Sequence, residues 1–340
     1  MRRQPRVAVI IVNYRTPELA MRCLASLAQE RAVLPSLTAT LVDGGSEDGS
    51  AEMLGNALAH TDYRAWASLL PLSINGGYGW ANNQAMLLLA RQEDPPEFFY
   101  VLNPDTEVCA GAVSHLLDEL LAHPRCGAAG SQLLASDGNV TPSAFRFPSP
   151  GRELIGAARS PALGQILGIP SIVVSPCDDR EVDWVTGASV LFRAQALVDT
   201  GLFDDGFFLY FEEVELMHRL QTRGWTVRHR PSSRVVHLEG ASTGVGAAVR
   251  DRPFPDYWYK SRRRYFELTN GAAALVAANV SALTGLSIAG FKRILGRPPT
   301  SRSLRAVDLL RFGFWPEAAR PSVPRLGDLP GRPPAWMQQA

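Results

Sequence analysis

Three glutamates stand among aromatic and aliphatic residues in the stretch GFFLYFEEVELMHRL, residues 206–220. At about 100° per residue, a helix through this stretch places Glu213 inside its apolar stripe. Glu212 and Glu215 flank Arg219, and surface pairing explains them. A carboxylate on an apolar face has a raised pKa, which suits a general base near neutral pH. The alternative for Glu213 is a helix N-terminal carboxylate favoured by the macrodipole.

Two further carboxylates follow an apolar run. Asp105 and Glu107 come after FFYVL, and alternate side chains of an extended chain point the same way. Such a pair can hold a hard divalent cation, Mg²⁺ or Mn²⁺, that bridges to substrate phosphates. His237 ends the run RVV, and its imidazole is acceptable to Mn²⁺ as a third ligand. The alternatives are an acidic turn and an ordinary packed histidine.

Two glycine-containing loops are candidates for ligand contact. Asp43 follows the run TLV and precedes two glycines, where a carboxylate can accept hydrogen bonds from a base or a sugar hydroxyl. An ordinary turn aspartate is the alternative. Residues 75–84, NGGYGWANNQ, fit neither GxGxxG nor GxxxxGK[ST], which disfavours a dinucleotide site or a P-loop.

The apolar runs that precede these loops predict a doubly wound α/β sheet. Strands are expected at residues 7–12, 38–42, 67–72 and 98–102, with helices between them at residues 18–27, after 51 and up to 90. In such a sheet, ligands bind beyond the carboxyl ends of the strands. The loops DGGSED, NGGYGWANN and NPDTE all lie there.

The second half of the sequence has a different composition. Residues 136–181 are rich in Pro, Gly and Ser and predict a long loop region that covers the sheet. A strand or strand pair is expected at 182–192, with short strands at 226–229 and 234–237. Residues 268–291 carry no formal charge and predict a buried or interfacial helix rather than a membrane span.

Charge and cysteine content narrow the setting of the protein. From residue 251 onward, 14 Lys or Arg stand against 6 Asp or Glu in a chain whose net charge is +1. This basic end suits contact with an anionic membrane, and the alternative is a solvated surface. The four cysteines show no metal-site or disulfide spacing, so reduced thiols are expected. The N-terminal apolar run is too short for a signal peptide, and we expect a cytoplasmic protein.

Together these segments resemble the family-2 glycosyltransferases, in particular their rhamnosyltransferase-like branch. The motifs occur in the family's order over residues 6–265. They are VAVIIVNYRTPELAMRCLASL, LVDGGSEDGS, NGGYGWANNQ, LNPDTEV, PSAFRFPS, DWVTGASVLFR, GLFDDGFFLYFEEVELMHRLQTRGW and VVHLEGAS.

The resemblance implies a GT-A fold, a nucleotide-diphosphate sugar donor, Mg²⁺ or Mn²⁺, and inverting transfer to a hydroxyl. Glu213 would be the general base, and Asp105 and His237 would bind the metal, with Glu107 as a further candidate ligand. The residues expected at the donor are Asp43, Asn75, Gly77, Asn83 and Asp105. The residues expected at the acceptor are Trp184, Thr186, Gly187 and Glu212.

Three positions depart from the family's pattern. Gly44 stands where asparagine is common, and Trp80 stands where a small residue is frequent and could reshape the donor pocket. FEEVEL replaces the common FEDVDL, so the base at Glu213 is one methylene longer, and Glu212 is a candidate to share its role.

The expected reaction is transfer of L-rhamnose from dTDP-rhamnose to a glycan or polyprenyl-linked acceptor in surface polysaccharide assembly. Galactofuranosyl or N-acetylhexosaminyl transfer from a UDP-sugar is the alternative within the class. A sugar nucleotidyltransferase and a noncatalytic nucleotide-sugar binding module are alternatives outside it.

We expect a glycosyltransferase domain at 1–265, with a nucleotide-binding half at about 1–130 and an acceptor half at about 131–265. A helical, basic, Pro-rich extension follows at 266–340. We expect no nucleic-acid partner. We expect peripheral attachment to the inner face of the cytoplasmic membrane.

Overall fold

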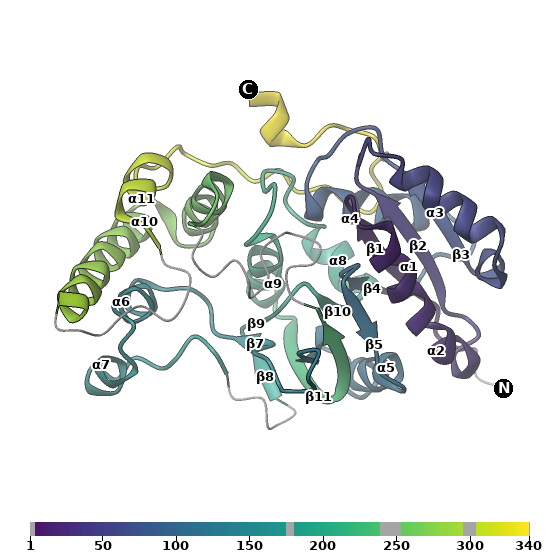
Figure 1. Cartoon of the computed structure of the whole chain (residues 1–340), viewed down its shortest axis with the longest axis horizontal. Helices are drawn as coiled ribbons and strands as arrows, with labels where there is room; N and C mark the ends of the chain where they lie inside the picture. Colours follow the sequence, from purple (N-terminus) through teal and green to yellow (C-terminus); the bar gives the residue numbers. More distant parts are fainter. Residues whose placement is uncertain (1–3, 175–179, 239–252, 295–303, 340) are drawn as a thin grey trace.

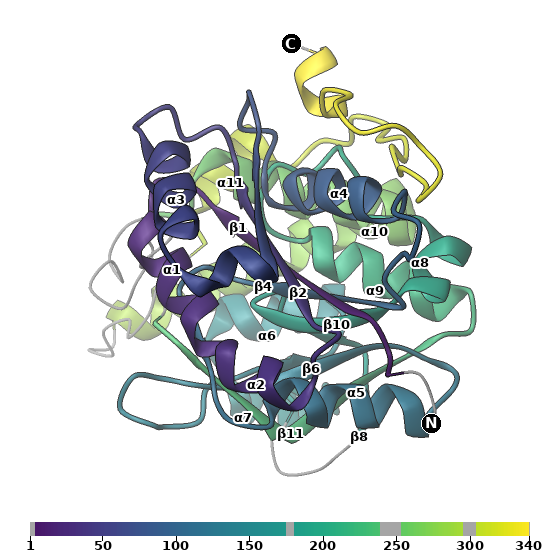
Figure 2. The same ribbon diagram turned by 90° about the vertical axis from the view of Figure 1, so that its right-hand side faces the viewer.

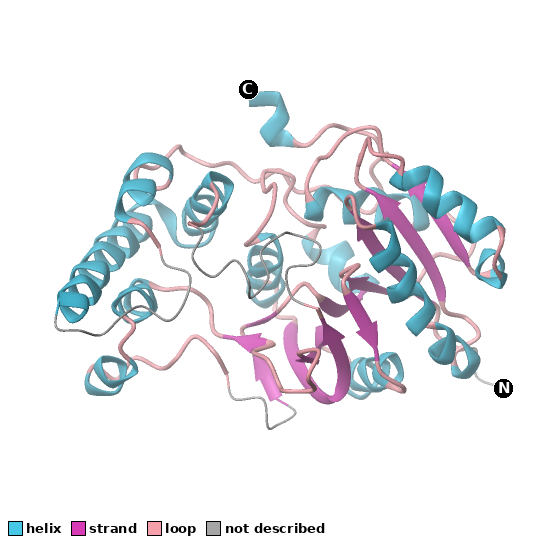
Figure 3. Cartoon of the chain, in the orientation of Figure 1, coloured by secondary structure: helices cyan, strands magenta, loops and turns pink. Residues whose placement is uncertain are grey.

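A mixed nine-stranded sheet forms the centre of the protein in the computed structural model (Figure 1, Figure 3). The structure describes residues 4–174, 180–238, 253–294 and 304–339. The strand order is β3-β2-β1-β4-β10-β6-β11-β5, and β8 pairs with β11 outside this order. The strands are β1 (Val7–Asn13), β2 (Thr38–Asp43), β3 (Ala67–Pro71), β4 (Phe98–Leu102), β5 (Thr106–Val108), β6 (Cys126–Leu134), β8 (Arg180–Val182), β10 (Ser189–Arg193) and β11 (Thr226–His237). A separate small sheet joins β7 (Ala144–Phe145) to β9 (Trp184–Val185).

The N-terminal half is a parallel sheet with both faces covered, as the continuous apolar runs predict. β1 pairs in parallel with β2 and β4, and β2 pairs in parallel with β3. Val7, Val9 and Ile11 enter one apolar core, while the alternate residues of β1 enter a second core on the opposite face. Figure 2 shows α1 and α4 on opposite sides of these strands. The helices of this half are α1 (Pro17–Ser26), α2 (Ala28–Val33), α3 (Ser50–Ala59), the 3₁₀ helix η1 (Asp62–Ala65), α4 (Tyr78–Leu89) and α5 (Ala112–Ala122).

The second half adds antiparallel strands to this sheet. β10 lies antiparallel between β4 and β6, and β11 pairs in parallel with β6 and antiparallel with β5. The two short strands expected at 226–229 and 234–237 are one strand, β11, with a shift in its pairing to β6 between Arg230 and Arg234. The predicted α/β fold is therefore confirmed: β1 to β4 are parallel throughout, and the rest of the sheet is mixed.

The long loop expected at residues 136–181 is wrong in part, because two helices lie within it. They are α6 (Pro150–Ala158) and α7 (Pro161–Ile166). Each has a proline in its first turn, where the missing N–H costs no helical hydrogen bond. The Ser149 hydroxyl also caps α6 by accepting from the Arg152 N–H. The prolines thus start helices here instead of marking loop.

A long helix, α10 (Asp256–Ile294), carries the uncharged run and is kinked at Gly271, whose φ is +83°. Arg262 is fully buried within it and bonds to Glu153 of α6 at 2.9 Å and to Asn279 at 2.6 Å. A Cβ at Gly285 would lie 2.5 Å from the Leu154 carbonyl oxygen, so α6 and α10 cross in close contact. α10 is therefore joined to the part of the chain before it through α6.

The remaining helices complete the C-terminal half. They are α8 (Ala194–Thr200), α9 (Glu212–Thr222), α11 (Ala306–Phe312) and the 3₁₀ helix η3 (Ala335–Gln339). The chain after α11 is mostly irregular, as its proline content predicts, and returns to the side of the molecule that holds α4 (Figure 1, Figure 2). Cys23, Cys109 and Cys126 are free thiols, whereas Cys177 and the end of the VVHLEGAS motif lie outside the described residues.

Candidate active site

Asp43 lies at the carboxyl end of β2, next to Asn13 at the end of β1. Its carboxylate accepts hydrogen bonds from Asn13 Nδ2 at 2.8 Å and from Ser46 Oγ at 2.7 Å and Ser46 N at 3.0 Å. These bonds hold the DGGSED turn against the end of β1. Asn13 was not singled out by sequence reasoning, although its place directly after the first strand was a usable signal. The contact of Asp43 with a nucleotide base stays a prediction.

The loop between β3 and α4 packs closely on the segment that precedes α9. Gly77 has φ +93°, and a Cβ there would lie 2.0 Å from the Phe208 carbonyl oxygen, so only glycine fits. Asn75 accepts from the Gly77 N–H at 3.2 Å, and the Tyr78 N–H donates to the Phe208 carbonyl at 3.1 Å. Residues 73–80 include the motif predicted to contact the donor, and we call them the donor loop. Asn75 thus shapes this loop, and its predicted donor contact is untested.

Asn83 is fully buried, and its side-chain amide is bonded within the protein. Its Nδ2 donates to the Phe203 carbonyl and to Asp205 Oδ1, both at 2.8 Å, and its Oδ1 accepts from the Phe203 N–H at 3.1 Å. Both ends of the amide therefore hold α4 against residues 203–205. This geometry gives Asn83 a structural role and lends no support to the predicted donor contact.

Asp105 and His237 come together across the β5–β11 pairing. His237 is the partner of Thr106 in that pairing, and its Nε2 lies 3.3 Å from Asp105 Oδ1. The chain turns at Asp105 before β5 begins, so the alternation expected for an extended chain does not hold. Glu107 instead forms an ion pair with Arg22 of α1, and its predicted place in the metal site is not supported.

The Asp105–His237 pair suits a divalent cation of the Mn²⁺ type, because it combines a carboxylate oxygen with an imidazole nitrogen. Asp105 is buried, and the His237 side chain is 17% exposed at the edge of the site. In the ranges that the structure covers, no group of three or more His, Cys, Asp or Glu side chains is placed to hold a metal. Two protein ligands leave coordination positions for phosphate oxygens.

Glu212 and Glu213 begin α9 beside the donor loop. A Cβ added at Gly187 would lie 3.6 Å from both the β- and γ-carbons of Glu213, and a Cβ added at Gly79 would lie 3.4 Å from the γ-carbon of Glu212. Burial raises the pKa of Glu213. Burial and the charge of Glu213 raise the pKa of Glu212 well above its usual range. One Oε2 atom of each carboxylate is buried without a hydrogen-bond partner in the described part of the chain.

Tyr78 joins these groups, although sequence reasoning did not single it out. Its hydroxyl donates to the Gly187 carbonyl at 2.9 Å. Burial raises the pKa of this phenol well above its usual value, and the charges of Glu212, Glu213 and Asp105 raise it further. Tyr78 is thus linked to the segment that contacts Glu213. A motif containing a tyrosine between two glycines was the signal that could have found it.

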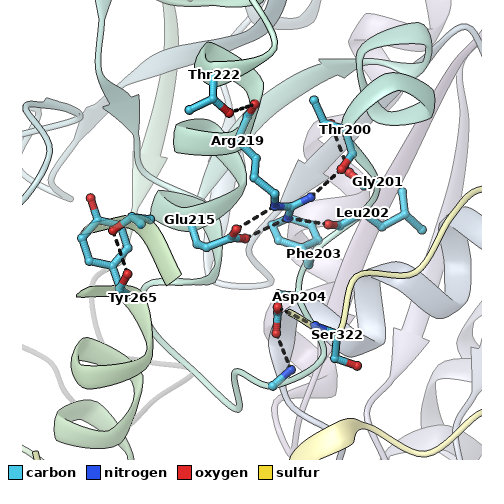
Figure 4. Close-up of polar contacts among 12 residues, drawn as sticks. Thr200, Gly201, Leu202, Phe203, Asp204, Glu215, Arg219, Thr222, Tyr265 and Ser322 are labelled. Carbon is cyan, nitrogen blue, oxygen red and sulfur yellow. Dashed lines mark hydrogen bonds and ion pairs between the residues drawn. The ribbon is translucent and has the colours of Figure 1, made fainter. Parts of the chain in front are cut away.

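The predicted phase of the glutamate helix is wrong for two of its three carboxylates. Glu212 and Glu215 are more buried than Glu213, at 3% and 4% exposed. Arg219 holds Glu215 with bonds of 2.7 and 2.8 Å and also donates to the carbonyls of Thr200 and Leu202 (Figure 4). The expected Glu215–Arg219 pair thus exists, but it is buried, because residues 200–206 cover the side of α9 that the helical wheel assigned to solvent.

The DWVTG segment lies beside Glu213. Trp184 stacks on Phe145 at 4.3 Å between ring centroids, and its Nε1 donates to the Arg146 carbonyl at 3.0 Å. Thr186 Oγ1 accepts from the Ala188 N–H at 3.3 Å. Gly187 is the residue of this segment that contacts Glu213, and its carbonyl also accepts from Tyr78. The structure thus brings Gly187, Glu212 and Glu213 together, while acceptor contact for Trp184 and Thr186 stays a prediction.

The chemistry open to the two carboxylates is deprotonation of a hydroxyl, and the chemistry open to the Asp105–His237 pair is cation binding. Two consecutive residues with positive φ, Tyr210 and Phe211, both at 69°, lead into Glu212. Such backbone costs free energy for residues other than glycine and is concentrated at functional sites. The strained turn fixes the position at which the two carboxylates enter the site.

Comparison with known proteins supports this chemistry. No family model matches the chain. N-acetylglucosaminyl-diphospho-decaprenol L-rhamnosyltransferase of Mycobacterium tuberculosis is 32% identical over 253 residues, which cover 69% of this chain and 77% of that protein. Rhamnosyltransferase WbbL of Escherichia coli K12 is 26% identical over 171 residues, 47% of this chain and 60% of that protein.

A solved structure agrees in fold. The mannosyltransferase PcManGT from Pyrobaculum calidifontis, in complex with GDP-Man and Mn²⁺, matches with a TM-score of 0.53 and 16% identity over 91% of this chain and 79% of that chain. The resemblance drawn from the motifs is confirmed: the chain is a glycosyltransferase of GT-A fold and belongs to the rhamnosyltransferase-like branch of the family-2 glycosyltransferases.

Proposed function

We propose that the enzyme transfers L-rhamnose from dTDP-rhamnose, with inversion, to a hydroxyl of a glycan or polyprenyl-linked acceptor in surface polysaccharide assembly. Support comes from the relative in Mycobacterium tuberculosis, whose name gives L-rhamnose and a decaprenol-linked acceptor. The observation that carries the proposal is the packing of Glu213 against Gly187, whose carbonyl accepts from the Tyr78 hydroxyl. The two alternatives outside the class, a nucleotidyltransferase and a binding module, lose their basis with the family assignment.

The base in this proposal is Glu213. Its buried, raised-pKa carboxylate takes the proton of the acceptor hydroxyl, which attacks the anomeric carbon from the side opposite the diphosphate. Burial and the charge of Glu213 raise the pKa of Glu212, so the two carboxylates do not ionise together, and we assign the shared proton to Glu212. One carboxylate of the pair is thus available as a base, and the other contributes a neutral hydrogen-bonding group beside it.

The cofactor in this proposal is Mn²⁺ or Mg²⁺ held by Asp105 and His237. A bound cation of this kind supplies a Lewis acid that stabilises the charge of the departing diphosphate. Asp105 contributes the hard oxygen ligand, and His237 contributes the nitrogen that favours Mn²⁺ over Mg²⁺. The Mn²⁺ in the mannosyltransferase complex is consistent with a divalent cofactor.

A donor screen tests this function. The protein is incubated with Mn²⁺, a polyprenyl-diphosphate N-acetylglucosamine acceptor and dTDP-rhamnose, UDP-galactofuranose or UDP-N-acetylglucosamine, and released nucleoside diphosphate is measured. We expect turnover with dTDP-rhamnose. In Glu213→Gln, turnover should fall by at least about 100-fold with dTDP binding retained. Glu52→Gln is the matched control, because Glu52 is also in a first helical turn but is exposed.

The proposed site of action is the inner face of the cytoplasmic membrane. The exposed face of α10 carries Val280, Phe291 and Ile294, at 52%, 64% and 83% exposed. The hydroxyls of Thr284 and Ser287 on the same helix donate to carbonyls one turn earlier, so this face offers lipid few free donors.

Further features of α10 fit an interfacial helix. In the described ranges it is the one helix with the length and apolar character to cross a bilayer, and 28% of its most apolar window is buried in the protein. Buried Ala278, Ala282 and Gly285 lie on the opposite face of the same part of α10, where Gly285 packs on α6. Lys292 and Arg293 in its last turn suit anionic lipid head groups. A helix lying at the membrane surface accounts for all three.

A further inference from the structure

The C-terminal segment crosses the catalytic domain and reaches the active site. We call residues 320–336 the strap. The Leu202 N–H donates to the Pro324 carbonyl at 2.9 Å, and the Asp205 N–H donates to the Ser322 carbonyl at 2.8 Å. The Ser322 N–H donates to Asp204 at 2.9 Å (Figure 4). The first part of the strap is thus anchored along the segment that leads to α9.

The second part of the strap is bonded to the donor loop and α4. Gln84 accepts from the Gly331 N–H at 2.5 Å, and Trp80 Nε1 donates to the Arg332 carbonyl at 2.8 Å. Trp336 Nε1 donates to the Gly76 carbonyl at 3.1 Å. Figures 1 and 2 both show this segment beside α4. Three hydrogen bonds therefore tie residues 331–336 to the sequence NGGYGWANNQ.

Trp336 connects the two halves of the active site. Its ring lies edge-on to that of Phe208, with 5.2 Å between centroids. The carbonyl of Phe208 in turn accepts from the Tyr78 N–H of the donor loop. Trp336 therefore contacts both the donor loop, through Gly76, and the segment that positions Glu213, through Phe208.

The strap also explains the unusual Trp80. Its side chain is 3% exposed, and a Cβ at Gly76 would lie 2.3 Å from its ring, so the loop folds directly over the indole. A buried indole N–H requires an acceptor, and the Arg332 carbonyl supplies it. The large residue in the donor motif and the C-terminal segment are thus complementary parts of one structure.

We propose that the strap holds the donor loop in its binding conformation, and that Trp336 and Trp80 are positioning residues for the nucleotide-sugar donor. Neither indole needs to touch the donor. Each fixes the backbone of residues 76–80, which faces the site, so their removal weakens donor binding and leaves the chemical step intact. The assignment of the bound molecule as a nucleotide sugar rests on the proposed function.

Full-length variants test the proposal. Trp336→Phe keeps an aromatic ring beside Phe208 but removes the N–H that donates to Gly76. Trp80→Phe keeps an aromatic ring in the loop but removes the N–H that donates to Arg332. We expect each to raise the donor KM, and the Kd for dTDP, about three- to tenfold, the effect of one lost hydrogen bond, with kcat changed less than about twofold. The matched control is Trp315→Phe, in the same extension but 69% exposed, which should change neither constant.

Hydrogen exchange of the donor-loop amides separates positioning from general damage. We expect faster exchange at residues 76–80 in Trp336→Phe and Trp336→Ala, with unchanged exchange in β1, β2 and β4. Faster exchange without weaker dTDP or UDP binding would overturn the proposal, and so would unchanged exchange. If the unaltered enzyme turns over none of the screened donors, the proposed function fails, whereas exchange together with calorimetry on dTDP and UDP still decides the role of the strap.

Discussion

Glu213 and Glu212 are adjacent carboxylates to which we assign different roles, Glu213 as the ionised base and Glu212 as its neutral partner. Burial raises the pKa of Glu213, and a protonated base is inactive. The value of kcat/KM should therefore fall as pH falls through this raised pKa, above the value of about 4.3 for an ordinary glutamate. If Glu213 is the base and Glu212 its neutral partner, this limb should stay in place in Glu212→Gln. A pH–rate profile of both proteins provides the measurement.

Rates add a second criterion for the same pair. Glu212→Gln should keep activity within about tenfold of the unaltered enzyme, since glutamine retains the neutral hydrogen-bonding group. An activity loss equal to that of Glu213→Gln, or a shift of the limb by a whole pH unit, would assign the base to Glu212 or to both.

His237 is the residue that tests the metal site. His237→Ala should raise the Mn²⁺ concentration for half-maximal activity at least about tenfold, because one of two protein ligands is lost. Glu107→Gln is the control and should leave the Mn²⁺ requirement unchanged, since Glu107 is paired with Arg22. Titration of activity with Mn²⁺ in chelator-treated protein measures both. Equal effects of the two substitutions would return Glu107 to the metal site.

The sequence predicted which residues come together better than it predicted where their side chains point. The structure brings together Asp105 and His237, and Glu213 and Gly187, as the motifs suggested. The side chain of Asn83 is turned into the protein, because an amide can serve a ligand or a buried loop equally well. The choice depends on the 203–205 segment, 120 residues away along the chain, which no local pattern contains.

Among the elements, α9 depends on a buried ion pair. Arg219 satisfies Glu215 and two carbonyls, so Arg219→Leu leaves a buried charge and unpaired acceptors. We expect a loss of about 3–5 kcal/mol in the free energy of unfolding, measured by urea denaturation. Arg223→Leu, at the exposed end of the same helix, should cost less than about 0.5 kcal/mol. Similar losses in the two variants would mean that the pair contributes little.

The elements also show where periodicity succeeds and fails. The parallel strands were predictable, because continuous apolar runs bounded by turn residues have few other uses. The phase of α9 was not predictable. A helical wheel assumes that one face of the helix meets solvent, whereas residues 200–206 cover that face. α6 and α7 were missed because proline ends a helix from within but starts one from its first turn.

Across the whole molecule, the exposed face of α10 determines the expected site of action. The double variant Val280→Glu/Phe291→Glu places two charges on one face, three turns apart. It should lower binding to vesicles containing phosphatidylglycerol at least about tenfold, because apolar burial at the interface is lost. Met53→Glu, an exposed apolar residue of α3, is the control. Cosedimentation measures both, and unaltered protein that ignores the vesicles would rule out membrane attachment.

The bonds of Trp80 and Trp336 to their acceptors span 252 and 260 residues. During translation at about 5–20 residues per second, the strap is made roughly 10 to 50 seconds after the loop that it contacts. The parallel strands can pair in that interval, yet the loop beside them still lacks its contacts with Arg332 and Trp336. A chain interrupted anywhere between residues 242 and 330 would contain every recognisable motif and still have an unfinished donor loop.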